Sequence, residues 1–179
     1  MGAGSAFLAS SEPLRASVLG KDGPRFAAHV SFYTSGSAAF FGPGAHTGAP
    51  ILLMVGERDD WAPARRVVAV ANFLKQENPG LPIKVNRYDA GHSWVSGGSR
   101  DYSASRKSFS DCPYTLYSGQ DFSRYLLTVD GNLSPTTGEE IRKVFSECRK
   151  PGATIEGSSE ATKQSLADLD GFLRMAEKQ

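Results

Sequence analysis

The chain has 179 residues and a formal net charge of +1, and 40% of its residues are hydrophobic. At about 150 residues per domain this length predicts one domain, and the composition excludes general disorder. The near-neutral charge argues against a nucleic-acid partner. The longest apolar run, residues 51–55, is far shorter than the roughly 20 residues of a membrane span. We therefore expect no nucleic-acid partner and no membrane span.

Short apolar runs alternate with helical patterns in the first half of the chain. The predicted elements are a helix over 4–19 with a break or kink at Pro13, strands over 26–33 and 51–56, a helix over 63–76 and a strand over 83–88. The strand at 51–56 is continuously apolar, which is typical of a strand buried on both faces of a parallel sheet. Strand, helix and strand with short connections predict the α/β class, with a parallel sheet and flanking helices.

The second half differs in character, because it is rich in Ser, Gly, Arg and Asp from about residue 95. The predicted elements there are a long loop over 95–113, a short strand over 125–129, a helix through Phe145 and a final helix capped by Ser158 or Ser159. We therefore divide the chain into an α/β core over 1–94, a loop-rich insertion over 95–157 and a C-terminal helix over 158–179 that packs on the core.

A carboxylate and a histidine follow two successive predicted strands. Asp59 lies in the loop after the strand at 51–56, and His92 lies in the loop after the strand at 83–88. In a parallel sheet both loops lie at the carboxyl edge, where open α/β sheets bind ligands. A carboxylate there can accept the Nδ1 proton of a histidine and stabilise the imidazolium that forms during acyl transfer. The sequence therefore predicts two members of a nucleophile–Asp–His triad.

The motifs around these two residues resemble those of the dienelactone hydrolase family within the α/β hydrolase superfamily. Its Gly-Glu-x-Asp-x-x-x-Pro strand end is matched by Gly56, Glu57, Asp59 and Pro63, and its Ala-Gly-His motif by Ala90, Gly91 and His92. The resemblance covers about residues 1–94, the C-terminal half of such a fold. It implies that Asp59 is the triad acid and His92 the general base, with Asp60 as the alternative acid.

The nucleophile elbow of that family, Gly-x-Ser-x-Gly or Gly-x-Cys-x-Gly, is not found in the sequence. The opening Met1-Gly2-Ala3-Gly4 is similar to the residues that follow the nucleophile in such elbows. By this resemblance we expect the nucleophile immediately before Met1, with the backbone N–H of Met1 in the oxyanion hole, and a chain truncated at the elbow. Ser5 is favoured as a serine within a helix rather than as a substitute nucleophile.

Several other residues each allow a structural and a functional interpretation. Trp61 and Trp94 flank the two loops. Packing of the loops against the sheet edge and an aromatic wall for an acyl group are equally favoured as their role. We interpret His29 as a core or cleft-lining residue and His46 as a solvated one. Asp60 is expected at the surface, and Glu57 is either an acid of the site or a carboxylate at the end of its strand.

Cys112 and Cys148 both lie in the predicted insertion. A zinc site needs three or four ligands, which the spacing of Cys and His does not supply, so we expect no metal. A disulfide between these cysteines would stabilise the insertion and is favoured over two free thiols. The disulfide would imply a periplasmic or secreted protein, and free thiols a cytoplasmic one.

The function that the resemblance implies is hydrolysis of a small carboxylic ester or lactone, without a cofactor. The alternatives are a non-catalytic α/β-hydrolase-like fragment, or another acyl hydrolase or peptidase of the same superfamily. A sheet cut at the elbow would leave an unpaired edge, so we also expect these 179 residues to self-associate.

Overall fold

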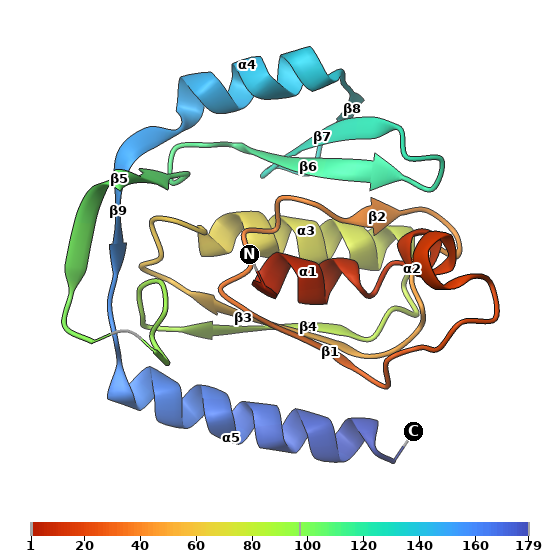
Figure 1. Cartoon of the computed structure of the whole chain (residues 1–179), viewed down its shortest axis with the longest axis horizontal. Coiled ribbons are helices and arrows are strands. Elements are labelled where there is room, and N and C mark those ends of the chain that lie inside the picture. The colour runs from red at the N-terminus through yellow and green to blue at the C-terminus, as the bar shows by residue number, and fades with distance from the viewer. Residues whose placement is uncertain (1, 97, 179) are drawn as a thin grey trace.

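The computed structural model describes residues 2–96 and 98–178 (Figure 1). In chain order, the elements of the first half are α1 (Gly2–Leu8), α2 (Glu12–Leu19), β1 (His29–Phe32), β2 (Phe40–Phe41), β3 (Ile51–Gly56), α3 (Ala64–Glu77) and β4 (Ile83–Tyr88). Those of the second half are β5 (Asp101–Ser108), β6 (Tyr114–Gly119), β7 (Arg124–Thr128), β8 (Leu133–Pro135), α4 (Gly138–Cys148), β9 (Lys150–Ile155) and α5 (Ser159–Ala176).

The centre of the molecule is a parallel sheet of order β1-β3-β4, in which Ile51 pairs with His29 on one side and Ile83 on the other. All six residues of β3 are buried, as the continuous apolar run predicts. Alternate side chains of a strand point to opposite faces, so β3 contributes to two cores. Ile51, Leu53 and Val55 pack with α3, whereas Leu52 and Met54 pack with α5. The predicted parallel sheet with flanking helices is confirmed.

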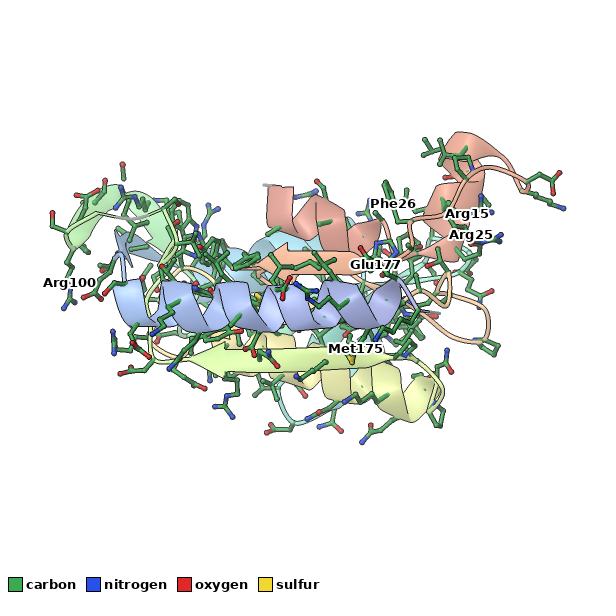
Figure 2. The ribbon with its side chains drawn as sticks, turned by 90° about the horizontal axis from the view of Figure 1, so that it is seen from below. Arg15, Arg25, Phe26, Arg100, Met175 and Glu177 are labelled. Carbon is green, nitrogen blue, oxygen red and sulfur yellow. A yellow bond between two sulfur atoms is a disulfide. The ribbon has the colours of Figure 1, made fainter. Side chains whose placement is uncertain are left out.

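Helix α5 covers the face of the sheet opposite α3, as Figure 1 shows, and Figure 2 views the sheet from the α5 side, with Met175 near the end of that helix. Phe172 and Ala161 of α5 are buried against Leu52 and Trp94. The hydroxyl of Ser158 accepts a hydrogen bond from the backbone N–H of Ala161 (3.2 Å), which is the predicted N-cap.

Two predicted elements of the first half have different bounds. The helix expected over 4–19 is two helices, and the expected break falls at residues 9–11, just before Pro13, which lies in the first turn of α2. Proline is tolerated there because the first N–H groups of a helix have no intrahelical partner. The strand expected over 26–33 is only the four residues of β1, because its partner strand begins at Ile51.

The region 95–157 was expected to be loop-rich, and this prediction is wrong for most of it. A second sheet of order β2-β6-β7-β8 packs on the side of α3 away from the central sheet, with α4 beyond it (Figure 1). Its inward side chains, among them Tyr117 and Leu127, join the core around α3. Strand β5 replaces part of the loop expected over 95–113, although its sequence has no apolar alternation, because it pairs with β9.

In the part of the chain that the structure describes, β1 pairs only with β3, so its other edge carries no strand. Unpaired strand edges favour association with other chains, and self-association stays a prediction. No helix in residues 2–96 and 98–178 combines the length and the apolar character that crossing a membrane requires.

Candidate active site

The loops after β3 and β4 meet at the carboxyl edge of the central sheet. The backbone N–H of Glu57 donates to the carbonyl of Tyr88 (2.9 Å), and the N–H of Arg58 donates to the carbonyl of Ala90 (3.0 Å). These bonds extend the pairing of the two strands past their regular ends. They bring the loop that carries Asp59 against the loop that carries His92.

The carboxylate of Asp59 is hydrogen-bonded to the imidazole of His92, with 2.7 Å between Oδ2 and Nδ1. The side chain of Asp59 is fully buried, whereas that of His92 is 17% exposed. The second oxygen, Oδ1, accepts the backbone N–H groups of Trp61 (2.9 Å) and Ala62 (2.7 Å). One oxygen of Asp59 therefore holds the turn before α3, and the other holds His92.

A cleft of about 930 Å³ lies beside His92. Its walls come from α1, the end of β1, the Asp59 loop and the segment after β5; the lining residues are Gly2, Ala3, Gly4, Ser5, Ala6, Leu8, Val30, Phe32, Tyr33, Ser35, Ser37, Trp61, Ala62, His92, Ser93 and Phe109. The volume is within the range of small-molecule sites, and the lining is largely apolar with a few polar groups, as is usual for such sites. Since Asp59 engages Nδ1, the nitrogen of His92 left for a ligand in the cleft is Nε2.

Two aromatic rings flank the imidazole of His92. The ring centroid of Trp61 lies 4.8 Å from that of His92, and the centroid of Tyr33 lies 5.3 Å from it. Tyr33 has a φ of 58°, a conformation that bulky residues rarely adopt. Its hydroxyl accepts the backbone N–H of Val95 (2.9 Å), and burial raises the pKa of the phenol. Tyr33 therefore ties the end of β1 to the loop that follows His92.

The two tryptophans, whose roles the sequence left equal, differ in the structure. Trp61 lines the cleft, whereas Trp94 is 1% exposed and its Nε1 donates to the hydroxyl of Ser165 on α5 (3.1 Å). Trp61 is thus part of an aromatic wall, and Trp94 is a packing residue that joins the His92 loop to α5.

The other sequence-predicted residues lie at or away from the cleft as follows. Ser5 lies within α1 and lines the cleft, His29 is a core residue 4% exposed, and Glu57 pairs with Arg87 at the strand ends. His46 was expected to be solvated, and this is wrong, because its Nε2 is buried where α2 and the 42–48 loop meet. Met1, the expected oxyanion-hole residue, lies outside the described residues.

Asp60 was expected to lie on the surface and is instead partly buried. Its backbone carbonyl and its carboxylate both accept hydrogen bonds from the region 95–157. Local sequence gives no indication of this, because its partners lie about 50 and 94 residues later.

Tyr33 and Phe109 are cleft residues that the sequence analysis missed. Tyr33 had a usable signal, because it ends the predicted strand 26–33 at the same carboxyl edge as Asp59 and His92. Phe109 had no such signal in the local sequence, because it reaches the cleft through the pairing of β5 with β9.

Cys112 and Cys148 form a disulfide, as predicted, with 4.9 Å between their α-carbons. It joins the segment after β5 to the end of α4. Among residues 2–96 and 98–178, no three His, Cys, Asp or Glu side chains are arranged to hold a metal ion.

Comparison with known proteins gives no relative on which to base a function. The models of known protein families, the curated proteins and the solved structures each contain no match to this chain. The chemistry of the cleft is therefore the basis on which a function can be assigned.

Proposed function

We propose that this chain carries the acid and base of a carboxylic ester or lactone hydrolase of the dienelactone hydrolase type. The observation that carries the proposal is the hydrogen bond between Asp59 Oδ2 and His92 Nδ1, 2.7 Å long, at the edge of a cleft. This pairing leaves Nε2 as the basic nitrogen, in the tautomer that a general base of acyl transfer requires.

In the proposed reaction, His92 Nε2 takes the proton of a serine hydroxyl or cysteine thiol while the oxygen or sulfur of that group attacks the ester carbonyl. Asp59 stabilises the imidazolium, which then gives the proton to the leaving alcohol and leaves an acyl-enzyme. His92 next takes a proton from water, whose oxygen attacks the acyl group, and returns that proton to the nucleophile. The products are a carboxylic acid and an alcohol, and no cofactor takes part.

The nucleophile of this proposal is the elbow residue that the resemblance places directly before Met1. Two observations agree with that position. Helix α1, which would follow the elbow, lines the cleft together with His92. Its residues Gly2, Ala3, Gly4 and Ala6 are small, and the hydroxyl of Ser31 on β1 donates to the carbonyl of Ala3 (2.5 Å), so the helix lies close against the strand.

The cleft supports a substrate of modest size with an apolar acyl group. Trp61, Tyr33 and Phe109 provide aromatic surface near His92. Aromatic walls of this kind bind apolar groups and exclude water from the reacting bond.

The test expresses the chain with the residues encoded in frame before Met1 and measures hydrolysis of p-nitrophenyl butyrate. We expect activity that His92→Ala lowers by a factor of about 10³ or more. We also expect the residue before Met1 to be labelled by a fluorophosphonate if it is serine, or by iodoacetamide if it is cysteine. His46→Gln is the matched control, because His46 does not line the cleft. Upstream codons without Gly-x-Ser or Gly-x-Cys, or activity that survives His92→Ala, would overturn the proposal.

A further inference from the structure

One short segment at the end of β9 is hydrogen-bonded to both loops of the site. We name residues 154–158 the strap. The backbone N–H of Thr154 donates to Oδ1 of Asp60 (2.9 Å), next to Asp59. Two residues later, the N–H of Glu156 donates to the carbonyl of His92 itself (3.0 Å). The strap therefore spans the distance between the acid loop and the histidine loop.

The strap continues along the histidine loop beyond this point. The N–H of Ser158 donates to the carbonyl of Trp94 (3.0 Å), and Ile155 forms a parallel bridge with His92. On this side the strap acts as a short additional strand beside the loop. Its contact with the acid loop, by contrast, depends on the Asp60 side chain.

Asp60 also holds the segment that follows β5. Its backbone carbonyl accepts the hydroxyl of Ser108 (2.7 Å), the hydroxyl of Ser110 (3.1 Å) and the N–H of Phe109 (3.2 Å). Phe109 is also a wall of the cleft. A single residue thus connects the acid loop to the strap through its carboxylate and to a cleft wall through its carbonyl.

The partners of Asp60 lie on two segments that a sheet and a disulfide hold together. Strands β5 and β9 pair with each other, and the disulfide joins Cys112, just after β5, to Cys148, just before β9. The disulfide therefore joins the two segments close to Ser108 and Phe109, where the segment after β5 contacts the Asp60 carbonyl.

The orientation of Asp59 depends on the same turn. Its Oδ1 accepts the backbone N–H groups of Trp61 and Ala62. The contacts of Asp60 hold the chain just before these two residues, and α3 begins just after them. If the Asp60 peptide moves, those N–H groups move with it, and the angle that Oδ2 presents to His92 changes. Sub-ångström displacements of this kind impair proton transfer far more than they impair folding.

We propose that Asp60 is a positioning residue, which holds the Asp59–His92 pair in register by binding the strap through its carboxylate. The effect of Asp60 on catalysis rests on the function proposed above, whereas its effect on the geometry of the Asp59–His92 pair does not. Asp60 touches no reacting atom, so it acts through Asp59 and His92.

The test compares Asp60→Ala, which removes the acceptor of the Thr154 N–H, with Asp60→Asn, which keeps an oxygen there. Asp170→Ala is the matched control, because Asp170 is an exposed carboxylate on α5 that pairs with Arg174. The readouts are the proton resonance of His92 Nδ1–H in the chain as it stands, and kcat and KM for p-nitrophenyl butyrate in the active protein.

We expect Asp60→Ala to shift or broaden the Nδ1–H resonance and to lower kcat by roughly tenfold or more with little change in KM. Asp60→Asn and Asp170→Ala are expected to resemble the parent protein in both measurements. An unchanged resonance in a folded Asp60→Ala, or a failure of Asp60→Asn to restore it, would overturn the inference.

Two further results are interpretable. If Asp60→Ala does not fold, Thr154→Pro removes the N–H that the Asp60 carboxylate binds, and an unperturbed Nδ1–H resonance in that variant would count against the role. If no variant and no parent hydrolyses esters, the proposed function fails, but the resonance still decides whether Asp60 positions the pair.

Discussion

Gly56, the last residue of β3, lies against the backbone of Ala90 so closely that a β-carbon at position 56 would be 2.4 Å from the Ala90 carbonyl oxygen. That carbonyl also accepts the N–H of Arg58. The glycine therefore allows the acid loop and the histidine loop to pack backbone against backbone, which brings Asp59 within reach of His92.

Gly56→Ala is accordingly expected to separate the two loops. Because the clashing atom belongs to the backbone, the loop cannot avoid it by a side-chain rotation, and we expect a loss of about 2–4 kcal/mol in the free energy of unfolding. The measurement is urea denaturation. Gly80→Ala is the control, since Gly80 is exposed and a β-carbon there would lie 3.6 Å from Asn78 Oδ1, an ordinary van der Waals contact. Equal stability of the two variants would contradict the close approach.

Asp59→Asn tests the tautomer of His92. The asparagine oxygen can still accept the N–H groups of Trp61 and Ala62, but its NH₂ group then faces Nδ1. We expect the imidazole proton to move to Nε2, which ¹⁵N NMR detects directly, and ester hydrolysis by the active protein to fall about 10³–10⁴-fold. Asp89→Asn is the control, because Asp89 is an exposed carboxylate paired with Arg58. A resonance pattern unchanged by Asp59→Asn would contradict the assignment.

The burial of His46 and His29 predicts that the protein is less stable in mild acid. Burial lowers the pKa of each imidazole below its ordinary value of 6.5. Below pH 6.5 the unfolded chain therefore binds more protons than the folded one, so the free energy of unfolding falls as the pH falls through this range. Urea denaturation at pH 7.5 and pH 5 measures the difference. His46→Gln combined with His29→Gln should reduce it, and an equal difference in the double variant would show that other groups are responsible.

Removing the disulfide is expected to destabilise the protein by roughly 2–4 kcal/mol, because Cys112 and Cys148 close a loop with a sequence separation of 36 residues. Cys112→Ala with Cys148→Ala, and the parent protein in reductant, should show the same lowered urea midpoint. A parent protein whose midpoint does not respond to reductant while it retains two titratable thiols would contradict the bond.

The elements that the sequence predicted well are those with a local cause. The apolar run of β3 and the helical spacing of Val67, Val70, Ala71 and Leu74 each determine their own structure, and all of these α3 residues are buried. Asp59 and His92 could be placed together because parallel strands bring their carboxyl ends to one edge. The pairing of the two cysteines followed because the sequence contains no others.

The elements that were missed depend on distant partners. Strand β5 is mostly exposed and polar, so it is a strand only because β9 pairs with it. For the same reason the sequence indicated neither Phe109 in the cleft nor the bonds of Asp60 to Thr154 and Ser108. The break near Pro13, by contrast, has a local cause, since proline is accepted in the first turn of a helix and not in its interior.

The disulfide has a topological consequence for the second sheet. Strands β6, β7 and β8 and helix α4 all lie between the two cysteines, so they belong to one covalent ring. A protease that cuts the exposed turn at Asp130–Asn132 would leave both new ends attached to the molecule. The same turn is therefore a place where the backbone can be opened without loss of a fragment, because between Cys112 and Cys148 covalent attachment does not depend on an uninterrupted backbone.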